Sequence, residues 1–246
     1  MAKPKVGIFD FTGCEGCELQ IVNCEDELLD ILGKIEIVNF REAMSRGRDD
    51  YEIALIDGGI STPSDVERIK SIREKAKLLI TIGSCSSTGG INCLKNFYPM
   101  EEVKRIVYGD MAKHFETIPA RPVSAVVKVD FSIPGCPIDK KEFLRCLTEL
   151  LAGKTPEIPN YAVCVECKLK ENECVFDKGL FCLGPVIRAG CEARCPTNNS
   201  ACEGCRGLVD NPNVSAEKDI LQKYGLTVAQ VMDRFKLFHG YYEQLV

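Results

Sequence analysis

Short apolar runs alternate with amphipathic stretches through the first 151 residues of the chain. The runs are mostly too short for buried helices and are rich in Ile, Val and Phe, which favours β-strands. They predict strands over residues 5–11, 35–40, 51–60, 77–82 and 123–131. Helical spacing lies between them and is clearest over residues 63–75, where Thr62 and Pro63 provide a helix start, and over about 139–151. This alternation predicts an α/β fold with a mostly parallel sheet.

A further helical pattern follows the first strand. It begins after residue 17 and carries five apolar residues, Leu19, Val22, Leu28, Leu29 and Ile31. The segment between the first strand and this helix, and the segment of residues 83–90 after the fourth strand, consist largely of small residues and predict turns.

The pattern changes at residues 153–159, where Gly153, Pro156 and Pro159 predict a linker. No apolar period runs through the next 45 or so residues. The chain then predicts two amphipathic helices, over residues 216–224 and 228–239, and the second has an apolar face of Val228, Val231, Met232, Phe235 and Phe238. We expect this face to pack against the chain itself or a neighbouring subunit. The organisation predicts two domains, residues 1–153 and 160–246.

Cysteine usage is unusual, with 15 cysteines in 246 residues. Eight of them occur in the loop-rich stretch that follows the linker: Cys164, Cys167, Cys174, Cys182, Cys191, Cys195, Cys202 and Cys205. Such a stretch requires a cross-link to order it, and the candidates are disulfides, zinc and iron–sulfur clusters.

Four other cysteines follow predicted strands. Cys14 and Cys17 come after the first strand, Cys85 after the fourth and Cys136 after the fifth. Because the carboxyl ends of parallel strands lie at one edge of a sheet, the three loops are expected to meet there. This placement predicts a further four-cysteine site.

Bulk composition narrows the choice of cross-link. The formal net charge of −5 argues against a nucleic-acid partner, and no apolar run reaches the ~18 residues that a membrane span needs. The first residues show no secretion signal, so we expect a cytoplasmic protein, in which disulfides are disfavoured. Zinc prefers paired cysteines two to four residues apart, whereas Cys174 and Cys182 stand alone. Iron–sulfur clusters are therefore favoured over zinc.

Six cysteine motifs occur together and in order: TGCEGC at residues 12–17, GSCSSTGG at 83–90, PGCP at 134–137, CLGP at 182–185, AGCEARCP at 189–196 and ACEGCRG at 201–207. Together they resemble the motifs of the small subunit of [NiFe] hydrogenases. Within that family the resemblance is to the soluble cytoplasmic group, whose subunits include the sulfhydrogenase delta-like and F420-non-reducing-like types. The resemblance implies a flavodoxin-like parallel-sheet domain followed by a loop-rich iron–sulfur domain with terminal helices.

The resemblance also implies a role and a set of ligands. The chain would relay electrons between the Ni–Fe site of a hydrogenase large subunit and a flavoprotein or ferredoxin-like partner, with no catalytic residue of its own. Three [4Fe–4S] clusters would carry the electrons. Their ligands would be Cys14, Cys17, Cys85 and Cys136 for the proximal cluster, Cys191, Cys195, Cys202 and Cys205 for the medial cluster, and Cys164, Cys167, Cys174 and Cys182 for the distal cluster.

Two positions depart from the periplasmic and membrane-linked members of the family. Those members usually begin the distal set with His, where this chain has Cys164. They often have Pro where this chain has Cys195, which leaves them a three-iron medial cluster. A fourth thiolate implies a [4Fe–4S] cluster here, with a lower potential suited to a low-potential acceptor.

Three cysteines remain outside the twelve. Cys24 and Cys146 are expected to be buried small apolar residues, and Cys93 is the alternative ligand if Cys85 is not one. Two rival interpretations stay open. One is a respiratory complex I-like cluster subunit, which would start with adjacent cysteines, and the other is a zinc-stabilised binding module.

Overall fold

A five-stranded parallel sheet forms the centre of the N-terminal part of the chain. The computed structural model describes residues 3–243. The strand order is β2-β1-β3-β4-β5, and every neighbouring pair runs parallel. The strands are β1 (Lys5–Asp10), β2 (Glu36–Phe40), β3 (Ile53–Asp57), β4 (Leu78–Ile82) and β5 (Phe131–Ile133). This is the flavodoxin-like order, so the predicted α/β fold class is confirmed.

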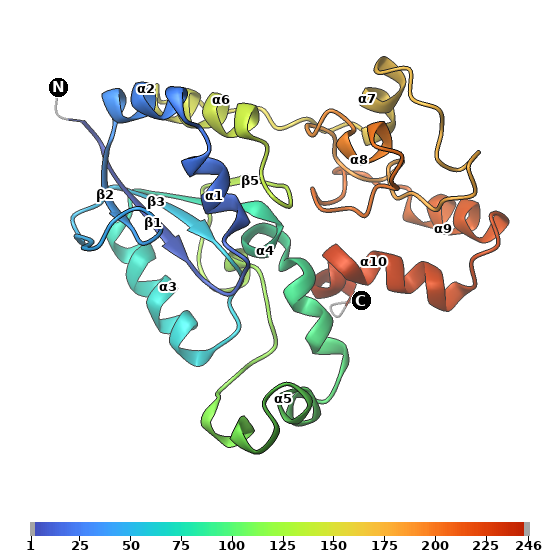
Figure 1. Ribbon diagram of the computed structural model, residues 1–246, viewed down its shortest axis with the longest axis horizontal. Coiled ribbons are helices and arrows are strands. Elements are labelled where there is room, and N and C mark those ends of the chain that lie inside the picture. Colours follow the sequence, from blue (N-terminus) through green and yellow to red (C-terminus); the bar gives the residue numbers. More distant parts are fainter. Residues whose placement is uncertain (1–2, 244–246) are drawn as a thin grey trace.

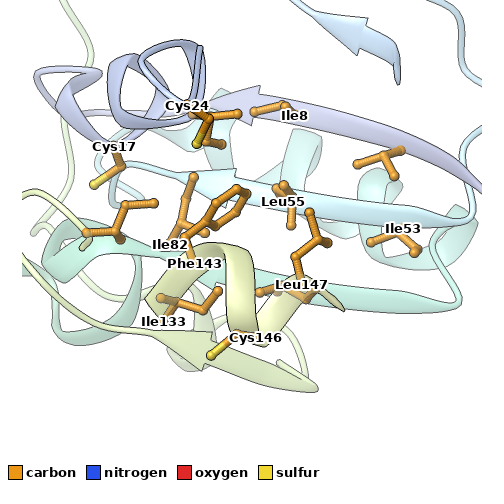
Figure 2. Packing of buried hydrophobic residues seen from close by; sticks show 14 of the residues in the cluster. Ile8, Cys17, Cys24, Ile53, Leu55, Ile82, Ile133, Phe143, Cys146 and Leu147 are labelled. Carbon is orange, nitrogen blue, oxygen red and sulfur yellow. The ribbon is translucent and has the colours of Figure 1, made fainter. Parts of the chain in front are cut away.

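Helices cover both faces of the sheet (Figure 1). Helices α1 (Gly16–Val22), α2 (Asp26–Lys34) and α6 (Lys140–Leu151) pack on one face, and α3 (Pro63–Lys75) packs on the other. Figure 2 shows the first of these layers, where Phe143 and Leu147 of α6 lie against Leu55 and Ile82 of the strands. Apolar side chains on both faces explain why the strands read as continuous apolar runs.

Two helices begin where the sequence predicts. At the start of α3, Thr62 Oγ1 accepts the N–H of Asp65 at 3.1 Å, and Asp65 Oδ2 accepts the N–H of Thr62 at 2.9 Å. This reciprocal arrangement satisfies donors that the first turn would otherwise leave free. At the start of α6, Asp139 Oδ1 accepts the N–H of Glu142 at 3.1 Å. The cap places α6 directly after the loop that carries Cys136.

The predicted fifth strand over residues 123–131 is wrong in its position. Residues 123–125 form a short 3₁₀ turn, η3 (Val123–Ala125), and only residues 131–133 pair with β4. The valines of this segment, Val123, Val126, Val127 and Val129, instead pack onto the layer beneath the sheet. The apolar pattern of these valines therefore reflects their packing against α3 and its neighbours. Residues 123–129 do not pair with β4.

Two further predictions need correction near the cysteines. The helix predicted after residue 17 is two helices, α1 and α2, separated at Glu25, whose φ is 45°. Leu19 and Leu29 are exposed at 49% and 72%, so they lie outside the core that the pattern implied. The segment predicted as a turn after β4 is a short helix, α4 (Gly83–Thr88).

A helical excursion separates α4 from β5. It consists of η1 (Gly90–Phe97), α5 (Met100–Tyr108) and η2 (Gly109–His114). The C-terminal helix α10 (Val228–Glu243) packs along η1, where Gly240 approaches the ring of Phe97. In Figure 1 α10 lies beside the helical segment that follows α4.

Between residues 160 and 243 the chain forms four helices, of which long loops join the first three and a short turn joins the last two. They are α7 (Val163–Leu169), α8 (Arg194–Thr197), α9 (Val214–Lys223) and α10. A separate apolar cluster includes Val163, Leu183, Leu221 and the α10 residues Val231 and Phe235, so these two residues of the predicted apolar face pack within this chain. The side chain of Val228, which the prediction also placed on that face, lies outside the described residues. In the part of the chain from residue 3 to residue 243, none of the helices combines the length and hydropathy required to cross a bilayer.

Candidate metal centres

The first group of thiols gathers at the carboxyl edge of the sheet. Cys14 and Cys17 follow β1, Cys85 lies in α4 after β4, and Cys136 follows β5. Electrostatic interactions connect Cys85 with Cys14 and Cys136, and connect Cys17 with Cys85 and Cys136. The three loops that the sequence predicts to meet therefore do so, and we call these four residues the first quartet.

Glycines make room for the sulfurs of the first quartet. Gly83 has φ +82°, and a Cβ on it would collide with the Sγ atom of Cys17. A Cβ on Gly16 would lie 3.3 Å from Sγ of Cys14 and 3.8 Å from Cβ of Pro137, which follows Cys136. The small residues of these turns therefore allow close approach of backbone and sulfur.

Asp57 holds the helix that carries Cys17. It ends β3 and is 4% exposed, and its Oδ1 accepts the N–H of Gly58 at 2.7 Å. The same carboxylate interacts with the thiol and the N–H of Cys17, while burial raises its pKa. The sequence shows the Asp-Gly-Gly turn at residues 57–59 without revealing this contact, since it joins β3 to the loop after β1.

A second group lies in the loops around α8. Cys191, Cys195, Cys202 and Cys205 form the second quartet, with Cys205 interacting with both Cys191 and Cys195, and Cys202 with Cys205 and Cys191. Burial raises the pKa of Cys205 to about 12 and that of Cys202 well above its usual value.

A third group lies between α7 and the CLGP turn. Cys164 interacts with Cys182, Cys167 and Cys174, and these four form the third quartet. A Cβ on Gly184 would lie 3.2 Å from Sγ of Cys182 and 3.5 Å from Sγ of Cys164, so both sulfurs border the same small space. Loss of solvation and the neighbouring thiols raise the pKa of Cys164 to about 12.

Direct contacts join the quartets in the order first, second, third. Ser84 Oγ, next to Cys85, lies within hydrogen-bond distance of the carbonyls of Gly135 and Cys205, and the backbone of Cys136 interacts electrostatically with the thiol of Cys205. The N–H of Cys202 donates to Sγ of Cys182 at 3.3 Å. The second quartet therefore touches both of the others.

The remaining cysteines are buried away from the quartets. Cys24, Cys93 and Cys146 are each 0% exposed, and Cys24 and Cys146 belong to the layer of Figure 2. Cys93 Sγ donates to the carbonyl of Ala120 at 3.3 Å, and burial raises its pKa to about 11. Cys93 lies beside Gly89 and Gly240, whereas Cys85 interacts with Cys14 and Cys136, so Cys85 stays the preferred candidate ligand of the two.

The chemistry of the donors fits a sulfur-ligated metal group. Ionising several thiols within a quartet is unfavourable, because burial and the neighbouring sulfurs raise the pKa of Cys85 to about 12. A bound cationic group reverses this cost, since thiolate is the form that ligates metal. Among residues 3–243, no three or more Cys, His, Asp or Glu side chains stand close enough to hold one metal ion. In a four-iron cluster each thiolate binds a different iron, so the ligands stand farther apart.

Several buried charged residues near the quartets were not anticipated from the sequence. Glu18, beside Cys17, is 1% exposed, and burial raises its pKa to about 8. Glu217 on α9 is equally buried and interacts with Cys164 and Cys182, and burial raises its pKa to about 7. Arg206 is buried beside Cys205. Glu18 directly follows Cys17, so its place near the first quartet could be predicted, but the burial of these side chains depends on elements that are distant in the chain.

Comparison with known proteins agrees with this architecture. Residues 14–150 match the model of the family described as NADH ubiquinone oxidoreductase, 20 Kd subunit. The chain is 38% identical to the sulfhydrogenase 2 subunit delta of Pyrococcus furiosus over 89% of this chain and 92% of that one. It is 32% identical to a vhu subunit of the F420-non-reducing hydrogenase of Methanocaldococcus jannaschii, over 96% and 94%.

Structural similarity extends over most of the chain. The solved [NiFeSe]-hydrogenase of Dm. baculatum superposes with a TM-score of 0.62 at 16% identity, covering 87% of this chain and 97% of that one. At this level of identity the similarity establishes the fold. The family description names a complex I-type subunit, the class kept as a rival, whereas both relatives above are named as hydrogenase subunits.

The fold and the relatives together define an oxidoreductase subunit of the hydrogenase type. The chain belongs to the [NiFe] hydrogenase small-subunit family, and it is the small subunit rather than the catalytic large subunit. Hydrogenase subunits of this kind imply a large-subunit partner.

Proposed function

We propose that this chain relays electrons through three [4Fe–4S] clusters, between the Ni–Fe site of a large subunit and a flavoprotein or ferredoxin-like partner. The observation that carries the proposal is the grouping of twelve thiols into three quartets, each with its own internal interactions. Bound clusters would supply one-electron redox chemistry, and the protein would supply ligation, spacing and electrostatics. We also propose the division into domains 1–153 and 160–246, with the first quartet in the former.

The order of the contacts supports a linear relay. The second quartet is joined to the first by the hydrogen bond from Ser84, next to Cys85, to the carbonyl of Cys205, and to the third by the hydrogen bond from Cys202 to Cys182. Electron transfer falls steeply with distance, so adjacent quartets are the expected stepping stones. The first quartet would therefore be proximal, the second medial and the third distal.

Each quartet has at least one thiol that is exposed in this chain: Cys14 and Cys136 of the first, Cys195 of the second and Cys164 of the third. Exposure is therefore compatible with electron entry and exit at the two ends of the relay, and the order of the contacts decides which ends these are. We assign the first quartet to the side that faces the large subunit, and the third to the side that faces the acceptor partner. The acceptors of the soluble group are NAD(P), F420 and ferredoxin-type carriers, so we propose a cytoplasmic complex.

The residues around the sulfurs would tune each centre. Cys182 accepts the N–H groups of Cys202 at 3.3 Å and Gly184 at 3.4 Å. Hydrogen bonds to ligand sulfurs stabilise the more negative, reduced state and so raise a cluster's potential. Cys195 completes the second quartet as a fourth thiol, which supports a [4Fe–4S] medial cluster over a three-iron cluster.

The test is metal analysis and electron paramagnetic resonance (EPR) of the chain purified with its large subunit, without oxygen. Three [4Fe–4S] clusters require about twelve irons and twelve sulfides per chain. A redox titration should show reduced four-iron signals. Zinc in place of iron would exclude the relay, and a three-iron signal in the purified protein would exclude the four-iron medial cluster.

A further inference from the structure

The side chain of Arg206 is buried between the first and second quartets. The side chain is 1% exposed, and the Glu142 carboxylate that pairs with it is 6% exposed. The pair is bidentate, with Arg206 Nη1 donating to Glu142 Oε2 at 2.7 Å and Nη2 donating to Oε1 at 2.8 Å. These atoms come from residues 64 positions apart, on α6 and in the loop after Cys205. A buried pair of this kind is costly to assemble and gives weak support for stability alone, so another role is worth seeking.

The same guanidinium also binds the backbone of two cysteine loops. Nη1 donates to the carbonyl of Pro134 at 2.9 Å, and Nε donates to the carbonyl of Ala189 at 2.7 Å. Pro134 precedes Cys136 of the first quartet by two residues, and Ala189 precedes Cys191 of the second by two. Arg206 itself follows Cys205. One side chain thus connects three ligand-bearing segments, and its planar fork makes four hydrogen bonds in doing so.

The backbone next to the guanidinium of Arg206 leaves no space for a side chain at residue 190. Gly190, between Ala189 and Cys191, has φ +112°, and a Cβ there would collide with Nη2 of Arg206 and lie 2.8 Å from Oε1 of Glu142. The loop that carries Cys191 is therefore shaped around the ion pair.

The charge of Arg206 is nearest the second quartet. It interacts electrostatically with Cys191 and Cys205, in addition to its partner Glu142. A positive charge stabilises the reduced, more negative state of a bound cluster, whereas Glu142 offsets that effect.

We propose that Arg206 is a positioning residue that fixes the second quartet against the first and raises the reduction potential of the medial cluster, with Glu142 limiting the increase. The proposal rests on the proposed function, because it requires clusters in both quartets. It assigns the spacing of the first electron-transfer step to one side chain that ligates no metal.

The test uses the complex with its large subunit and three variants. Arg206→Met removes the positive charge, Glu142→Gln leaves that charge unpaired, and Arg206→Lys keeps a charge without the planar fork. Potentials come from redox titration followed by EPR, and the spacing of adjacent reduced clusters comes from the splitting of their spectra. Arg73→Met serves as control, because Arg73 binds Lys128, Asp130 and Ala76 and no cysteine loop.

The expected shifts of the medial potential have opposite signs, downward for Arg206→Met and upward for Glu142→Gln. Arg206→Lys should remain nearer the wild-type potential but change the splitting, since an ammonium group cannot hold all four acceptors. The control should change neither quantity. Shifts of the same sign in Arg206→Met and Glu142→Gln, or an unchanged splitting in Arg206→Lys, would overturn the proposal.

Measuring the cluster content of each protein distinguishes a failure of the electron-relay proposal from a failure of the proposal for Arg206. If Arg206→Met fails to assemble its medial cluster, Glu142→Gln and Arg206→Lys still decide the question through the sign of the potential shift and the splitting. Wild-type protein with fewer than three clusters contradicts the relay itself, whereas a full complement with unshifted variants contradicts only the role of Arg206.

Discussion

The N–H of Cys202 donates to Sγ of Cys182 at 3.3 Å, although the two residues belong to different quartets. Cys182 also accepts the N–H of Gly184, and these bonds oppose the effect of burial on its pKa, which is raised overall. Through this hydrogen bond, a residue of the second quartet contacts a sulfur of the third. A substitution at Cys202 is therefore expected to disturb the second quartet most, and the third quartet only at Cys182.

Replacing Cys202 by Ala should remove one cluster while leaving the sheet intact. The variant would lose about a third of the iron, because three thiols hold a four-iron cluster poorly. The sheet should stay folded, because the apolar layers around it contain no residue of the second quartet. Iron analysis and far-ultraviolet circular dichroism would check both parts. Cys146→Ala is the matched control, and it should keep all the iron while costing roughly 1 kcal/mol for the lost buried sulfur. Loss of all iron in Cys202→Ala would contradict three separate sites.

Cys85 and Cys93 should respond differently to the same substitution. Cys85→Ala is expected to abolish the cluster of the first quartet, whereas Cys93→Ala should retain every cluster because its sulfur contacts the carbonyl of Ala120 instead of the other thiols. Iron content and the EPR spectrum of the reduced protein provide the measurement. An intact EPR spectrum in Cys85→Ala together with a lost signal in Cys93→Ala would show that Cys93, and not Cys85, is the ligand.

Gly83→Ala should damage the first quartet more than its backbone strain alone explains. Gly83 has φ +82°, and a methyl group there would collide with the sulfur of Cys17. Gly153 has a similar φ of +73° with no atom within 4 Å of a Cβ, so Gly153→Ala measures the strain alone, about 1 kcal/mol. Melting temperature and iron content of the two variants should therefore differ clearly. Equal effects would show that the contact with Cys17 is relieved at no cost.

His239 should make the protein sensitive to acid. It is 3% exposed, and burial lowers its pKa to about 4, an effect that the nearby backbone of Gly204 only partly offsets. The unfolded chain takes up this proton near pH 6.5, so the imidazole contributes no penalty above that pH and progressively destabilises the fold as the pH falls toward 4. The full effect is about 3 kcal/mol.

The measurement is thermal unfolding of His239→Phe and wild type between pH 5 and 7.5. The stability difference between them should shift in favour of the variant as the pH falls. His114→Phe serves as control and should keep the wild-type acid sensitivity, because His239 is still present. A pH-independent difference between His239→Phe and wild type would rule out titration of His239 as the cause.

Local pattern determined most of the secondary structure. Thr62, Pro63 and Asp65 predict the start of α3 because capping and the fixed φ of proline act within one turn. The valines of residues 123–129 led to a wrong strand for the complementary reason. Their apolar alternation is the same for a strand and for an extended segment pressed onto a neighbouring layer, and only pairing with β4 distinguishes them.

The meeting of three cysteine loops was also within reach of the sequence. Once strands and helices alternate, parallel strands bring their carboxyl ends to one edge, and residues that follow them must meet there. Which four of the eight later cysteines belong together came from a family resemblance, because loops without a period carry no geometric rule.

Only the tertiary structure decided which polar groups surround the sulfurs. Asp57, Glu142 and Arg206 look like ordinary charged residues in the sequence, yet all three are buried, Asp57 beside Cys17 and the Glu142–Arg206 pair where α6 meets the loop after Cys205. Burial and pairing depend on contacts across tens of residues, and no local pattern encodes them. The sequence by itself thus determined most strands, most helices and the candidate thiol ligands. Only the tertiary structure decided how the quartets lie relative to one another and which buried charges lie beside them.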